Sequence, residues 1–139
     1  MPLPLFIKWT EGNEIGLELV DEQHRGIVSI INTFYYQMGR KMSNKLLYSC
    51  ISDTMKNYSR IHFLTEESFL ELAGYKDLEY HRELHRNLTL EIDNIESQGI
   101  KDNDARPLLD FLKKWWLEHI NQEDQLYAPF LRLHGKSML

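Results

Sequence analysis

Apolar residues recur at steps of three and four positions through four long segments of this 139-residue chain. That spacing places them on one face of an α-helix, and it is typical of helices that pack against one another. The segments span about residues 21–38, 43–72, 77–98 and 107–129. Because short polar loops separate them, they predict an all-α fold, an antiparallel up-down-up-down four-helix bundle.

Glycine, serine and proline residues mark the predicted helix ends. Gly39, Gly74 and Gly99 each follow an apolar stripe, at a position where a helix commonly ends. Ser43 is expected to cap the second helix, because its hydroxyl can accept a bond from the first helical turn. Pro129 is expected to end or kink the fourth helix, because proline lacks an N–H and clashes with the preceding turn.

The first 19 residues lack helical periodicity and contain two prolines and two glycines. They predict an extended N-terminal arm, and their apolar content favours contact with the bundle. We therefore expect a single domain over residues 1–139, with the arm at 1–19 and the four-helix bundle at 20–130.

Composition and charge exclude several classes of protein. A net charge of −5 argues against a nucleic-acid or anionic-membrane partner, because both need a basic surface. No apolar stretch reaches the ~18 to 20 residues that a membrane-spanning helix needs. Cys50 has no second cysteine to pair with, and we expect it to be a small core residue. Since the start has no signal-peptide pattern, we expect a cytoplasmic protein.

Histidines and carboxylates fall on the apolar stripes instead of the polar faces. His62 and Glu66 are four residues apart, and so are His81 and His85. Residues at that spacing lie about 40° apart around a helix, so both members of each pair point into the core. His24 heads the stripe of the first helix. Burying such groups is costly unless each finds a partner, and a metal such as iron, manganese, zinc or copper would satisfy them all.

His119 and Asp124 lie on the fourth helix, but they are five residues apart. Five steps separate two side chains by about 140° on an ideal helix. Both can reach one metal only if the helix is locally distorted, for example by a π-bulge. Alternatively, the carboxylate reaches sideways and spans two metals. This spacing is awkward for a site that holds a single ion.

Ordinary structural histidines and three well-known metal motifs fit this pattern less well. A single histidine pair would favour a structural role, but here four helices each contribute to the inward set. Glu83 lies between His81 and His85 at the wrong position for either zinc-protease motif. Ferritin-like di-iron proteins need Glu-x-x-His on two helices, and no Glu lies three residues before any His here.

The ordered set of histidines and carboxylates resembles the ligand pattern of the hemerythrin family. Three short motifs carry the resemblance further: D-x-Q-H at Asp21–His24, W-x3-H-I at Trp115–Ile120 and D-x2-Y at Asp124–Tyr127. Trp9 resembles the aromatic residue of that family's N-terminal arm. The resemblance covers residues 9–127, and it implies a four-helix bundle that holds two iron ions joined by an oxo or hydroxo bridge.

The resemblance also implies a role for each candidate ligand. Three residues would bind the first iron: His81, His85 and His119. Two residues would bind the second iron: His24 and His62. Two carboxylates would bridge both ions: Glu66 and Asp124. The second iron would keep an open position for molecular oxygen.

A dry pocket is expected around that open position, because water promotes the loss of reduced oxygen species. By motif position, five residues would line it: Ile27, Phe63, Trp115, Trp116 and Ile120. The position of Trp116 is often leucine in the family. Its larger ring either narrows the access of oxygen or simply fills the core, and the sequence leaves both alternatives open.

The resemblance implies reversible oxygen binding, for transport, storage or scavenging, by a protein that is not an enzyme. One alternative is an oxygen or redox sensor that acts through an unidentified protein partner. Another is a di-iron enzyme of the oxidase or peroxidase type, although the sequence places no additional general acid or base near the ligand set.

Overall fold

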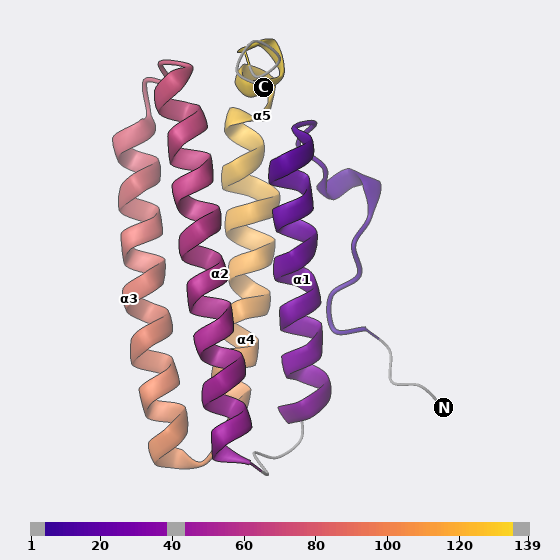
Figure 1. The fold of residues 1–139 in the computed structure, drawn as a ribbon, viewed down its shortest axis with the longest axis vertical. Coiled ribbons are helices and arrows are strands. Elements are labelled where there is room, and N and C mark those ends of the chain that lie inside the picture. The colour runs from indigo at the N-terminus through magenta and orange to yellow at the C-terminus, as the bar shows by residue number, and fades with distance from the viewer. Residues whose placement is uncertain (1–4, 39–43, 135–139) are drawn as a thin grey trace.

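The computed structural model describes residues 5–38 and 44–134, whose helices run alternately up and down (Figure 1). The helices are α1 (Glu18–Met38), α2 (Lys45–Leu72), α3 (Leu78–Asp102), and a fourth built from α4 (Arg106–Trp115), the π-helix η2 (Trp116–Glu123) and α5 (Asp124–His134). Helix α1 contacts α2 and α4, and α3 contacts the same two helices. This neighbour pattern confirms the predicted up-down-up-down bundle, and the described ranges contain no strand.

The structure corrects the predicted start of the second helix by one residue. Asn44 is the N-cap of α2, and its side chain accepts a hydrogen bond from the backbone N–H of Leu47. The predicted cap, Ser43, and the predicted stop at Gly39 lie outside the described residues. The predicted stop at Gly74 is confirmed, because this residue follows α2 with a φ of 72°, in the left-handed region that favours glycine.

The predicted helix end at Gly99 is wrong. Helix α3 passes through this residue to Asp102, and Asn103, with a φ of 53°, forms the left-handed cap. A Cβ atom at Gly99 would lie only 2.5 Å from the hydroxyl oxygen of Tyr48 on α2. Glycine is therefore needed here because it leaves room for the side chain of Tyr48 on the neighbouring helix, and not because the helix ends.

The fourth helix does not end at Pro129, because α5 continues to His134. Figure 1 shows the last turns of α5 viewed end-on above the other helices, turned away from the bundle axis. A bend of this kind is the second of the two outcomes expected for a proline inside a helix. None of the helices in the described ranges has the length and apolar character needed to cross a membrane.

The described part of the N-terminal segment, residues 5–17, runs beside α1 (Figure 1) and includes the short 3-10 turn η1 (Glu11–Asn13), and α1 begins at Glu18, within the range predicted for the arm. Asn32 holds one point of it, because its side chain accepts from the N–H of Ile7 and donates to the carbonyl of Ile7, both at 2.8 Å. Asp21 holds another, since its carboxylate accepts from the N–H groups of Ile15 (2.7 Å) and Gly16 (3.2 Å).

The inner faces of the helices form two separate apolar clusters. The lower cluster, toward α4, includes Ile27, Phe63, Trp115, Trp116 and Ile120. The upper cluster, toward α5, includes Val20, Leu70, Tyr127 and Leu131. Between the clusters, α1, α2 and the fourth helix place His24, Glu66 and Asp124, so a polar layer crosses the bundle.

Cys50 is exposed, and its prediction as a core residue is wrong. The inner face of α2 is instead formed by Tyr48, Ser52 and Met55, all of them buried. Because successive residues turn about 100° around a helix, Cys50 lies on a side of α2 that faces away from this stripe.

Candidate metal centre

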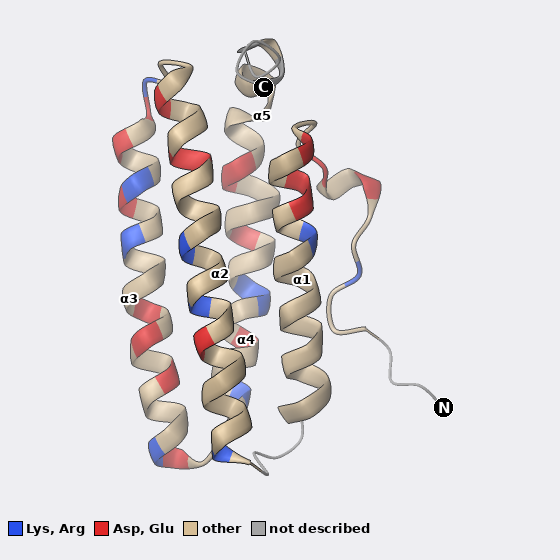
Figure 2. Ribbon diagram, in the orientation of Figure 1, with Lys and Arg blue, Asp and Glu red and all other residues tan. Residues whose placement is uncertain are grey.

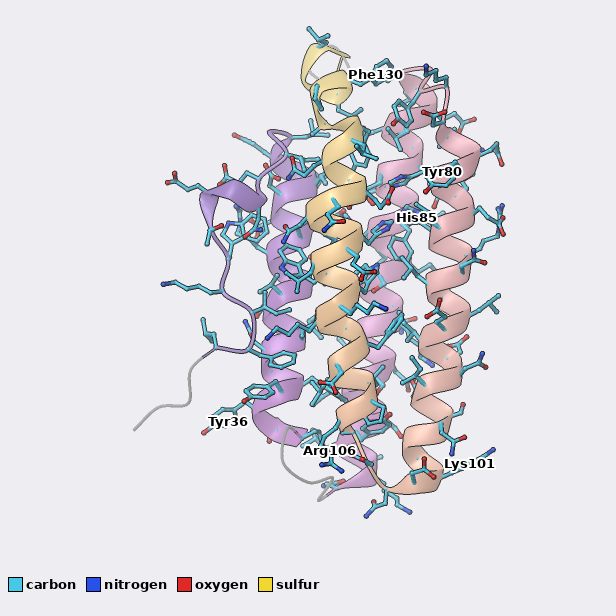
Figure 3. All side chains as sticks on the ribbon, turned by 180° about the vertical axis from the view of Figure 1, so that it is seen from behind. Tyr36, Tyr80, His85, Lys101, Arg106 and Phe130 are labelled. Carbon is cyan, nitrogen blue, oxygen red and sulfur yellow. The ribbon has the colours of Figure 1, made fainter. Side chains whose placement is uncertain are left out.

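Seven residues from the four bundle helices meet in the polar layer, and none is more than 4% exposed. They are His24 of α1, His62 and Glu66 of α2, His81 and His85 of α3, His119 of η2 and Asp124 at the start of α5. The structure thus brings together all seven residues that the sequence singled out as candidate ligands. Figure 3 shows one of them, His85, turned from α3 toward the interior of the bundle.

The first of two donor groups contains three histidines and two carboxylates. Its members are Glu66, His81, His85, His119 and Asp124, and their ligand atoms all lie within 4.8 Å of one another. The Nε2 atoms of His81 and His119 are each 3.2 Å from Oδ1 of Asp124. Nε2 of His85 is 3.5 Å from Oε1 of Glu66. Five potential ligand atoms are therefore close enough together to hold one cation.

The second donor group contains two histidines and the same two carboxylates. Its members are His24, His62, Glu66 and Asp124, again with their ligand atoms within 4.8 Å. The Nε2 atoms of His24 and His62 are 3.0 Å apart. Asp124 faces this group with Oδ2, which is 3.2 Å from His24, and the first group with Oδ1. A carboxylate that presents one oxygen to each group is suited to bridge two cations.

The π-helix η2 explains how His119 and Asp124 reach the same place. The backbone N–H of Asp124 donates to the carbonyl of His119, five residues earlier, which is the π-helical bond pattern. Residues five apart therefore lie on the same side of this segment. Of the alternatives that the sequence left open, the local distortion of the helix is the one observed, and Asp124 belongs to both donor groups as well.

Several buried donor atoms of the layer have no hydrogen-bond partner among the described residues. They are Nδ1 of His24, Nε2 of His81, His85 and His119, Oε1 of Glu66 and both carboxylate oxygens of Asp124. An unpaired polar atom in the interior is costly, and this cost is far greater for an ionised carboxylate. Imidazole nitrogens and carboxylate oxygens are ligands for iron, manganese and zinc. The residues present therefore fit a pair of metal cations.

Carboxylates and histidines in this layer shift one another's pKa. Burial alone would lower the pKa of His24, but contacts with Asp124 and Glu66 outweigh it and raise the pKa to about 9. The same balance raises the pKa of His81 to about 10. Burial dominates at His119 and lowers its pKa to about 4. Burial opposes ionisation of both carboxyl groups, yet neighbouring histidines lower their pKa values. A cation that binds here at neutral pH must therefore displace protons from His24 and His81.

Three further residues contact the ligand side chains, and the sequence analysis did not assign them to the site. Gln23 accepts a hydrogen bond from Nδ1 of His62 at 2.9 Å. Glu67 accepts from Nδ1 of His85 at 2.8 Å. The hydroxyl of Tyr127 donates to Oε2 of Glu66. Gln23 and Tyr127 stand in two of the three short motifs, and Glu67 follows a ligand directly, so the sequence contained a hint of each.

The five residues predicted to line a pocket are all buried in the lower cluster, directly below the donor groups. Phe63 stacks on His85, with ring centroids 4.0 Å apart, and Trp115 stacks on His119. Trp116 and His24 are nearly perpendicular, with ring centroids 6.0 Å apart. An apolar wall therefore covers both donor groups on this side.

Comparisons with known proteins agree with this geometry. The family described as hemerythrin HHE cation binding domain matches residues 15–131. A bacteriohemerythrin of Clostridium acetobutylicum is 31% identical over 128 residues, which cover 86% of this chain and 96% of that protein. A bacteriohemerythrin of Stenotrophomonas maltophilia is 25% identical over 127 residues, covering 91% and 82%. The crystal structure of a wild-type hemerythrin has the same fold, with a TM-score of 0.81 at 22% identity, over 91% of this chain and 98% of that chain.

Proposed function

Because the chain belongs to the hemerythrin family, we propose that it binds molecular oxygen reversibly at a di-iron centre in the polar layer of its bundle. The observation that carries this proposal is the pair of buried donor groups that share Glu66 and Asp124. The family match over residues 15–131 includes every member of both groups. We take residues 1–139 as a single domain, of which the arm is a part.

We assign the ligands by donor group. His81, His85 and His119 would hold the first iron. His24 and His62 would hold the second iron. The carboxylates of Glu66 and Asp124, which belong to both donor groups, would be shared by the two ions, together with an oxo or hydroxo group. The second group offers one residue fewer than the first, so oxygen is expected to bind on that side. Two ferrous ions would supply the electrons for holding oxygen. These electrons would return to the metal ions when oxygen is released.

The surrounding residues of the chain keep this chemistry reversible. Ile27, Trp116 and Ile120 are at most 1% exposed, and they exclude water from the side of the second donor group. A dry pocket limits the escape of reduced oxygen species. Gln23 and Tyr127 orient His62 and Glu66 through hydrogen bonds. Such a site suits a carrier, store or scavenger of oxygen, and we propose a binding protein instead of an enzyme.

Iron loading under anaerobic conditions tests the proposal. The ferrous protein should hold two iron ions per chain by elemental analysis and gain a visible absorption band when it is exposed to air. The band should bleach under argon and return with air. A Glu118→Gln variant, altered at an exposed residue beside His119, is the matched control. Failure of the band to appear on a fully loaded protein, or its irreversible decay with turnover of a substrate, would refute reversible oxygen binding.

A further inference from the structure

His62 and His85 each form a hydrogen bond through Nδ1, the ring nitrogen that faces away from the donor groups, but the two acceptors differ in charge. Nδ1 of His62, in the second group, donates to the neutral amide oxygen of Gln23 at 2.9 Å. Nδ1 of His85, in the first group, donates to the carboxylate of Glu67 at 2.8 Å. Both rings turn Nε2 toward the donor groups, so both outer bonds act on a ligand. The two halves of the centre therefore differ in charge just outside the ligands.

The carboxylate of Glu67 is held at both of its oxygens. Oε2 accepts from His85, and Oε1 lies 3.4 Å from Nε of Arg82. The ring of His85 is itself held by Phe63, which stacks on it with the two ring planes 12° apart. The side chain of Glu67 is only 17% exposed. These contacts fix the imidazole ring and the carboxylate relative to each other.

Arg82 does not depend on Glu67 alone. It also forms ion pairs with Glu71 at 3.3 Å and with Glu79 on the outer side of α3. Acidic and basic residues alternate along this part of α3 (Figure 2). Glu71 is 68% exposed and belongs to the surface, whereas Glu67 reaches inward to a ligand. If Glu67 had only a surface role, it would be exposed like Glu71 and would contact Arg82 alone. Its contact with His85 distinguishes it from Glu71.

An ionised hydrogen-bond acceptor changes a ligand imidazole in two ways. It fixes the ring orientation, and it raises the basicity of the nitrogen that faces the metal. A neutral amide such as that of Gln23 does the first but contributes little to the second. A more basic imidazole favours the higher charge of an oxidised metal.

We propose that Glu67 is a positioning residue of the metal centre, whose charge acts through His85 to strengthen the three-histidine group as a ligand for the more oxidised metal. Gln23 orients His62 without adding charge. The second donor group, where oxygen is expected to bind, therefore donates less electron density to its metal ion than the first. This inference rests on the proposed pair of metal ions, but it does not rest on the binding of oxygen.

The decisive variant is Glu67→Gln, which keeps an oxygen that can accept from His85 and removes the charge. Metal affinity is measured by titrating the metal-free protein with Zn²⁺ or Co²⁺ against a chromophoric chelator. We expect binding of one of the two ions to weaken about 10- to 100-fold, as for other outer partners of ligand histidines. The reduction potential of the iron-loaded protein, measured by spectroelectrochemistry, should rise.

Three comparisons keep this experiment interpretable. Glu71→Gln removes an exposed partner of Arg82 and should change neither affinity nor potential. Glu67→Ala removes both charge and hydrogen bond, and it should resemble Glu67→Gln if charge is what matters. Gln23→Glu places a carboxylate against His62 and should lower the reduction potential. Circular dichroism and unfolding of each metal-free variant check that the bundle forms.

The outcomes separate this inference from the proposed function. Wild-type affinity and potential in Glu67→Gln, with a loss only in Glu67→Ala, would reduce Glu67 to an orienting contact and overturn the proposal. If Glu67→Gln behaves as expected but air produces no reversible band, the inference stands and oxygen binding fails. A wild-type chain that takes up neither Zn²⁺ nor Co²⁺ would overturn both.

Discussion

The backbone N–H of Asp124 donates to the carbonyl of His119, and the same two residues bring Oδ1 and Nε2 to 3.2 Å of each other. A π-helical segment has poorer hydrogen-bond geometry than an α-helix, and such segments are frequent at functional sites. Here the distortion aligns two residues that an α-helix would separate by about 140°. The backbone of the fourth helix is therefore shaped around the two donor groups.

The shared carboxylates make the two donor groups interdependent, which predicts unequal effects of ligand substitutions. Asp124→Asn should abolish tight binding of both metal ions, because Asp124 belongs to both groups. His62→Ala should leave about one ion per chain, because His62 belongs to the second group alone. Elemental analysis after loading with Zn²⁺ measures the stoichiometry. Glu123→Gln, at the neighbouring position, should retain both ions, and equal losses in Asp124→Asn and His62→Ala would contradict the assignment.

The hydrogen bond from Tyr127 to Glu66 predicts a loss of stability when the hydroxyl is removed. Both residues are fully buried, so Tyr127→Phe leaves a carboxylate oxygen without its donor. A hydrogen bond to a charged group contributes about 1.5 to 3 kcal/mol. Urea unfolding of the metal-free variant should show a decrease of that order. Tyr75→Phe, on the adjacent half-buried ring, is the control, and an equal effect of both changes would argue against a special role of Tyr127.

Metal binding should release protons at neutral pH. In the metal-free fold the pKa values of His24 and His81 are about 9 and 10, so both imidazoles are protonated at pH 7. A metal binds only the neutral ring, so we expect release of about two protons per chain at pH 7. Affinity should rise with pH until about 9 to 10, where these groups lose their protons. Calorimetric titration with Zn²⁺ in buffers of different ionisation enthalpy measures the release, and a value near zero would contradict this prediction.

His119 should contribute nothing to that release. Burial lowers its pKa to about 4, so its ring is already neutral at pH 7. It competes with the metal for a proton only when the pH falls toward 4. Loss of bound metal in mild acid should therefore follow protonation of His24 and His81 before that of His119, as metal content measured after dialysis at stepwise lower pH would reveal.

Trp116 is expected to limit the access of oxygen. Its ring is 1% exposed and lies between His24 and Trp9, with centroid distances of 6.0 and 5.6 Å. Trp116→Leu should open space beside the second donor group and speed oxygen binding in stopped-flow measurements. The lost contacts should cost about 2 to 4 kcal/mol in urea unfolding of the metal-free protein.

A matched change at an exposed neighbour separates access from general loosening of the bundle. Leu117 is 47% exposed, and Leu117→Ala should alter neither stability by more than about 0.5 kcal/mol nor the rate of oxygen binding. Lower stability of Trp116→Leu at an unchanged oxygen rate would mean that the ring only fills the core.

The amino-acid sequence was sufficient to predict the bundle and the seven residues that meet in its polar layer. Helical periodicity is a local property, and residues four apart, such as His81 and His85, share a face whatever the rest of the chain does. The five-residue spacing of His119 and Asp124 likewise indicated either a helix distortion or a bridging carboxylate. The family resemblance, confirmed by the comparisons, then assigned a chemistry to the set.

Only the tertiary structure decided which residues surround that set. Gly99 lies against the hydroxyl of Tyr48 and does not end α3, and Cys50 lies on the exposed side of α2 instead of in the core. The contact between Glu67 and His85 joins two helices. Such contacts depend on the distance and rotation between helices, which arise from side-chain packing across the whole core. The spacing of residues along the chain does not specify that geometry. It therefore predicts the candidate ligands, whereas the residues that contact those ligands are known only from the tertiary structure.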